Sequence, residues 1–139
     1  MKKYYLFVIK NDYYRIYRKN PYILYKILER LYMLEKYDFS YGLSLYNQLC
    51  QPFSVKLLKN YITNKYKYNN INSNIIKLKS IVEKTFLQIG YASTIILTNI
   101  DYPEILKIFN IYNRKIFVCE FNQNKYFWLN QKLIKNSKK

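Results

Sequence analysis

The chain has 139 residues, of which 50% are hydrophobic, and it carries a formal net charge of +16 with no histidine. A chain of this length buries a core without metals or disulfides, and its apolar content excludes a disordered protein. Without histidine the commonest general base and metal ligand are missing, and two glycines cannot build a phosphate-binding loop. We therefore predict a protein that is not an enzyme and has no cofactor, metal or small-molecule substrate.

The positive charge is spread along the chain, with local concentrations at 56–67 and 132–139. Lysine is abundant together with asparagine, isoleucine and tyrosine, which is the pattern of AT-rich codons, so the charge does not identify a function. It does favour rapid association with an acidic protein or a nucleic acid. Every apolar run is too short for a bilayer, and the first one is followed by Lys10-Asn11-Asp12 in place of a cleavage site. A cytoplasmic protein that does not enter a membrane is expected.

The N-terminal part of the chain predicts one strand and one long helix. Tyr4–Lys10 is apolar at both odd and even positions, which indicates a strand buried on both faces. Asp12–Lys19 is interpreted as an aromatic and basic link. A helix is expected from Asn20-Pro21 to Lys36, because Asn and Pro suit a helix start and leucine and isoleucine then recur at helical spacing.

The middle of the chain predicts two shorter helices and one ambiguous segment. The first helix contains Leu43 and Cys50 and ends at Gln51-Pro52. Ser54 is expected to cap the second helix. Next, the Asn-rich residues 66–74 are predicted to form a loop. Residues 74–83 fit either a helix or a strand.

The last part of the chain predicts two hairpins separated by a helix. β-branched and aromatic runs at Thr85–Ile89 and Ser93–Ile100 indicate the first hairpin, and Asp101 is expected to cap the helix. The closing hairpin, Lys115–Leu129, contains the only tryptophan, Trp128. Because a hairpin this apolar must be covered, Trp128 is predicted to be a core anchor.

Together these elements predict one α+β domain over residues 1–131. Its sheet is expected to have about five strands, mostly antiparallel, packed against about four helices. Residues 132–139 are predicted to be a basic, disordered tail. Cys50 and Cys119 have no cysteine or histidine neighbour, so both are predicted to be small buried side chains outside any disulfide.

Three tyrosines follow the first strand in a polar context. Tyr13, Tyr14 and Tyr17 alternate with Arg15 and Arg18, and full burial of all three rings is not expected. Exposed tyrosine beside arginine is typical of an interface hot spot. Two interpretations stay open for this cluster, namely binding of a partner and ordinary packing.

Several short motifs occur in the order and approximate spacing of one known family, over nearly the whole chain. These motifs are Tyr4-Tyr5 to Ile9-Lys10, Tyr13 and Tyr17, Gln51-Pro52, Thr85-Phe86, Asp101-Tyr102, and the closing cassette Phe121-Asn122, Lys125-Tyr126 and Trp128-Leu129-Asn130. In these features the chain resembles the sporulation inhibitor of replication family, SirA, of spore-forming Firmicutes.

The resemblance implies a small cytoplasmic inhibitor that acts during sporulation. Members of the family bind the N-terminal domain of the replication initiator DnaA and block new rounds of chromosome replication. Carried over by position, the partner-binding residues are Tyr13 and Tyr17, with Leu45 and Gln48 as secondary candidates. Tyr13 stands where the family has phenylalanine, and Leu45 stands where it has a polar amide.

An alternative function is direct binding of nucleic acid by the basic surface. The two functions differ in their dependence on salt. Affinity for nucleic acid falls by orders of magnitude as salt rises, in proportion to the phosphates contacted. An interface anchored by aromatic side chains loses far less.

Overall fold

The computed structural model describes residues 1–34, 39–66 and 75–132, and these residues form a seven-stranded antiparallel sheet with five α-helices and a further helical turn at 129–132. The strands are β1 Lys2–Ile9, β2 Cys50–Gln51, β3 Ile75–Lys79, β4 Lys84–Ile89, β5 Thr94–Thr98, β6 Ile116–Glu120 and β7 Lys125–Trp128. The helices are α1 Asn11–Tyr17, α2 Pro21–Leu34, α3 Phe39–Leu49, α4 Val55–Tyr66 and α5 Ile105–Tyr112, and a 3-10 turn, η1, spans Phe121–Gln123. The predicted α+β class is therefore confirmed, with more strands than expected.

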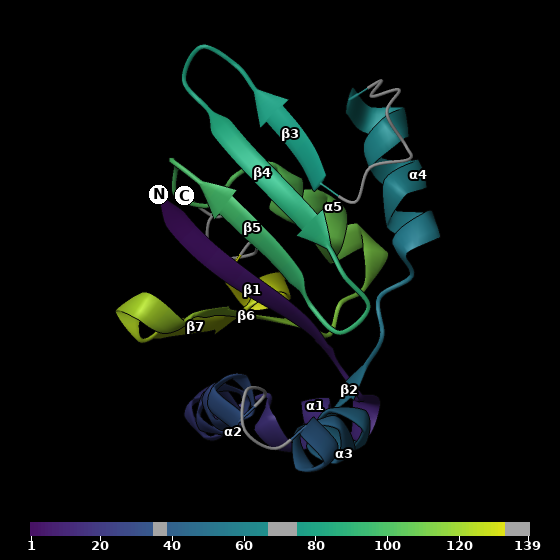
Figure 1. The fold of residues 1–139 in the computed structure, drawn as a ribbon, viewed down its shortest axis with the longest axis vertical. Coiled ribbons are helices and arrows are strands. Elements are labelled where there is room, and N and C mark those ends of the chain that lie inside the picture. Colours follow the sequence, from purple (N-terminus) through teal and green to yellow (C-terminus); the bar gives the residue numbers. More distant parts are fainter. Residues whose placement is uncertain (35–38, 67–74, 133–139) are drawn as a thin grey trace.

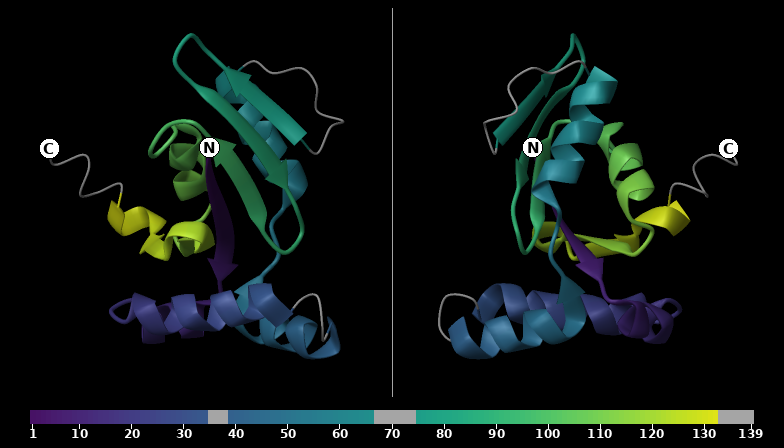
Figure 2. Two further views of the ribbon diagram at one scale, coloured as in Figure 1. Left: turned by 60° about the vertical axis from the view of Figure 1, so that its left-hand side comes forward. Right: turned by 90° about the vertical axis from the view of Figure 1, so that its right-hand side faces the viewer.

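The strand order is β3-β4-β5-β1-β6-β7, and the two-residue β2 pairs with the end of β1. Figure 1 shows α5 behind the upper part of the sheet and α4 beside it on the right, whereas α1, α2 and α3 lie together below it. The two further views in Figure 2 show the same separation of the helices into two groups. The sheet therefore contributes to two cores, one on each face.

Alternating side chains of β1 point into these two cores. Leu6 and Val8 lie in the upper core, which α4 and α5 cover, and Phe7 and Ile9 lie in the lower core, which α1 to α3 cover. Burial of each such side chain contributes about 1.5–3 kcal/mol. The prediction of a first strand buried on both faces is confirmed.

The ambiguous segment at 74–83 contains β3. Its buried residues, Ile76 and Leu78, alternate with exposed ones, which is the two-residue period of a strand. β3 pairs with β4 in register, so β3, β4 and β5 form a meander and not a single hairpin. This strand and the short β2 account for the two strands beyond the predicted five.

The interpretation of Asp12–Lys19 as a link is wrong, because α1 occupies most of it. The helix begins after Lys10, whose side chain makes no capping hydrogen bond, and none of the helical residues is fully buried. Such a short helix is stabilised by tertiary contacts and not by local sequence. The acidic Asp12 in the first turn is a weak local signal of a helix start, and it does not identify a helix by itself.

The capping role predicted for Asp101 is also wrong. Asp101 forms an ion pair with Lys2, and α5 begins after Glu104 without a side-chain cap. The N–H groups of Leu106 and Lys107 instead donate to the backbone carbonyls of Pro103 and Glu104, both at 3.0 Å. Tyr102 adopts a positive φ of 51° just before this turn. The carboxylate of Asp101 is thus directed to the start of β1 and not to the helix.

The closing hairpin is confirmed. β6 and β7 pair in register, and Asn124, at the turn, has the left-handed φ of 53° that asparagine tolerates. Trp128 is 1% exposed, as expected for a core anchor. The predicted loop at 66–74, the predicted end of the long helix at Lys36 and the predicted tail at 132–139 lie wholly or largely outside the described residues.

Both cysteines are buried and unpaired, as predicted. Burial raises the pKa of the Cys50 thiol to about 12 and raises that of Cys119 well above its ordinary value. Because the thiolate is the reactive form, both groups should be inert at pH 8 in the folded protein. We expect a chromogenic thiol reagent to label the native protein about a thousandfold more slowly than the urea-unfolded protein. Rapid labelling of one thiol without urea would contradict this burial.

Candidate protein-binding surface

The start of α1 is fixed to the end of α3 by Lys10. Its backbone N–H donates to the carbonyl of Leu49 at 3.0 Å, and its ammonium group donates to the carbonyl of Asn47. β2 pairs with β1 at the same place, through Cys50 and Ile9. The two helices that carry the predicted site residues are thereby held against each other.

Three of the four predicted site residues are in direct contact or stacked. The rings of Tyr13 and Tyr17, one helical turn apart on α1, stack with centroids 6.4 Å apart and planes inclined by 15°. The side-chain amide of Gln48 on α3 donates to the hydroxyl of Tyr13 at 2.9 Å. The resemblance implied that these residues, from two segments distant in sequence, belong to one surface, and the fold places them together.

Leu45 lies one turn before Gln48 on α3. Its side chain is half-buried and packs against the lower core, as do the rings of Tyr13 and Tyr17. We call Tyr13, Tyr17, Leu45 and Gln48 the tyrosine surface. It combines half-buried apolar groups with a hydroxyl and an amide at the surface, a combination that also occurs in protein interfaces.

The closing hairpin supports this surface from behind. The indole N–H of Trp128 donates to the backbone carbonyl of Tyr17 at 3.2 Å, and its ring meets that of Tyr14 edge-on at 4.8 Å. The hydroxyl of Tyr14 accepts a hydrogen bond from the Asn130 amide at 3.1 Å. A surface held in this way loses little conformational freedom when a partner binds.

Sequence reasoning missed Ile16. In a helix this residue lies one turn after Tyr13, and its side chain is 58% exposed. Its spacing of three residues from Tyr13 could have identified it. This spacing places two side chains side by side only in a helix, and α1 was not predicted to be one. Exposed Arg15 and Arg18 on and just after α1 add positive charge near the surface.

Three carboxylates among the described residues form ion pairs with lysines, namely those of Glu29, Asp101 and Glu104. Glu29 accepts hydrogen bonds from Tyr25 and Lys26 at 3.2 Å. In the described ranges, no cluster of three His, Cys, Asp or Glu side chains suited to a metal ion occurs. Likewise, no helix among these residues has the length and apolar character needed to span a membrane.

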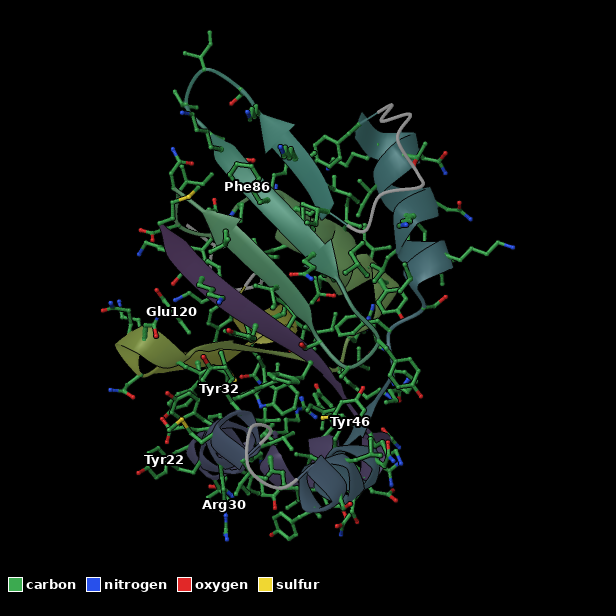
Figure 3. All side chains as sticks on the ribbon, in the orientation of Figure 1. Tyr22, Arg30, Tyr32, Tyr46, Phe86 and Glu120 are labelled. Atoms are coloured by element: carbon green, nitrogen blue, oxygen red, sulfur yellow. The ribbon has the colours of Figure 1, made fainter. Side chains whose placement is uncertain are left out.

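A groove of about 380 Å³ lies between the sheet and the helices α2 and α3. Tyr5 and Ile95 line it from the sheet, while Tyr32 and Tyr46 line it from the helices. Figure 3 shows the last two side chains directed from their helices toward the sheet. This groove is separate from the tyrosine surface, whose residues do not line it.

No protein-family model matches the sequence, and no curated protein matches it significantly. The likeness to the SirA family therefore depends on the motifs quoted above. The residues of the tyrosine surface were selected by these motifs, and the distances and burial described above show that they lie together on α1 and α3.

Proposed function

We propose that this chain is an inhibitor of replication initiation, active during sporulation, that binds the N-terminal domain of the initiator DnaA through the tyrosine surface. The support comes from Tyr13, Tyr17, Leu45 and Gln48. The family resemblance selected them from two segments distant in sequence, and the 2.9 Å hydrogen bond from Gln48 to Tyr13 connects these segments. The inhibitor acts in the cytoplasm, by binding alone, without a catalytic step or a cofactor.

Inhibition follows from occupying a surface that the initiator needs for contact with other initiation factors or with its own copies. Tyr13 and Tyr17 are the apolar anchors, and each such anchor is worth about 1–4 kcal/mol on truncation. The hydroxyl of Tyr13 is oriented by Gln48, so its position is set before the partner arrives. The positive charge of +16 mainly increases the rate of association.

The test is a calorimetric titration of the purified full chain with the purified N-terminal domain of DnaA. We expect saturable binding at one to one, with affinity that falls by less than about tenfold between roughly 0.05 and 0.2 M salt, because aromatic burial dominates. The same titration with an unrelated acidic domain of similar size is the control. Failure to bind, or equal binding to the control, would exclude this function.

A further inference from the structure

One face of the sheet is left open in the upper half of the molecule. α4 and α5 cover the opposite face, and no described helix lies over the front of β3, β4 and β5 (Figure 1). We call this region the open sheet face. Its outward side chains belong to Lys3, Ile75, Lys77, Lys79, Lys84, Phe86, Gln88, Ile95 and Leu97.

This face is basic. It carries four lysines and no carboxylate at these nine positions, and none of the ion pairs found among the described residues includes any of the four. Lys79 and Lys84 stand directly opposite each other on β3 and β4. Like charges in this position destabilise a sheet, and a bound anion would remove that repulsion. The nearest carboxylate in the sequence, Glu83, lies in the turn between these two strands.

An aromatic ring lies between the positive charges. The register places Lys77, Phe86, Leu97 and Lys3 in one row across four strands. Phe86 is half-buried, and Figure 3 shows its ring on the front of β4. Three strand spacings separate Lys77 from Lys3, which is about 14 Å. A base stacked on Phe86 would therefore have an ammonium group within reach of the phosphates on each side.

We propose that the open sheet face binds single-stranded nucleic acid, with one base stacked on Phe86 and phosphates held by Lys77, Lys79, Lys84 and Lys3. Stacking on an aromatic ring combined with a basic track is how sheet proteins hold unpaired strands. A duplex offers no exposed base to the ring. A second copy of this chain would bring lysines against lysines, and an acidic peptide would leave the ring without a stacking partner. The groove beside α2 and α3 adjoins this face through Tyr5 and Ile95.

This inference does not rest on the proposed inhibition of DnaA, because the tyrosine surface uses other elements. The test measures fluorescence anisotropy of a labelled oligothymidylate of about 12 nucleotides with the full chain. We expect binding that is at least about tenfold tighter than to a duplex of equal length. No binding to the single strand at low salt, or equal binding to the duplex, would overturn the proposal.

Two triple variants separate this face from the general charge of the protein. Lys77→Ala, Lys79→Ala and Lys84→Ala remove three charges from the open sheet face. Lys56→Ala, Lys107→Ala and Arg114→Ala remove three exposed charges on or beside α4 and α5. The first set should weaken binding about tenfold or more. It should also reduce the slope of log affinity against log salt concentration by about two, because about three phosphate contacts are lost. The second set should change both quantities little. Equal effects of both sets would overturn the proposal.

The ring is tested separately from the charges. Phe86→Ala should weaken binding about 5- to 100-fold without changing the salt dependence, whereas Phe86→Trp should retain it. Thermal unfolding checks that both variants are folded. Tyr17→Ala should leave the affinity for the oligonucleotide unchanged, because Tyr17 lies outside the open sheet face. The nucleic-acid proposal and the DnaA proposal can therefore fail independently of each other. Unchanged oligonucleotide binding by the folded Phe86→Ala variant would contradict stacking of a base on this ring. In a competition experiment, displacement of the labelled strand by polyglutamate as readily as by unlabelled oligonucleotide would contradict it as well.

Discussion

Replacement of Trp128 with alanine should lower the free energy of unfolding by about 3–5 kcal/mol, the usual cost of deleting a large buried ring. The ring is 1% exposed and meets Phe117 and Tyr14 edge-on, at centroid distances of 4.9 and 4.8 Å. Its N–H also donates to the carbonyl of Tyr17. Since domains of this kind are stable by about 5–15 kcal/mol, the variant should keep only part of its stability.

Urea unfolding followed by far-ultraviolet circular dichroism measures this loss. Trp128→Phe keeps much of the packing and removes the N–H donor. The Tyr17 carbonyl still accepts a hydrogen bond from the N–H of Asn20 at 3.1 Å. The free energy of unfolding should therefore fall by only about 1 kcal/mol. Tyr91→Ala is the matched surface control, because that ring is 66% exposed, and it should change stability by no more than about 0.5 kcal/mol. A loss for Trp128→Ala as small as that of the control would show that the hairpin does not anchor α1.

The parts of the fold that the sequence predicted well have strong local patterns. β1 has apolar side chains on both faces, and the closing hairpin has two apolar runs around an asparagine turn. α1 has neither pattern: it lacks a side-chain cap at Lys10 and contains no fully buried residue. It forms because Trp128 and Asn130, more than 100 residues later, bond to Tyr17 and Tyr14. Such contacts are invisible to any local reading.

The same reasoning explains what could be predicted of the two surfaces. Tyr13 and Gln48 are 35 residues apart, and only the family resemblance selected both. Their hydrogen bond depends on the antiparallel pairing of β2 with β1. Because β2 is only two residues long, no sequence pattern predicts it. The open sheet face depends on β3, whose segment fitted a helix equally well. If it were a helix, Lys77 and Phe86 would not share a row.

Tyr17→Ala should weaken binding to the N-terminal domain of DnaA by about 30-fold or more, which corresponds to about 2 kcal/mol. The side chain is half-buried, and the group that accepts the indole N–H of Trp128 is the backbone carbonyl of Tyr17, which the substitution retains. The variant should therefore stay folded while losing one of the two stacked rings. Titration calorimetry with the purified pair measures the change, and circular dichroism verifies the fold.

Matched variants test whether the effect belongs to this surface. Tyr22→Ala removes an exposed tyrosine of α2, 56% accessible, and should leave the affinity unchanged. Tyr13→Phe restores the residue of the SirA pattern, keeps the ring and removes only the acceptor of the Gln48 amide, so its effect should be below about tenfold. If Gln48 acts by orienting Tyr13, Gln48→Ala should add nothing to Tyr13→Phe. Affinity within twofold of the original for folded Tyr17→Ala would move the interface away from α1, because Tyr17 and Tyr13 form one stacked unit there.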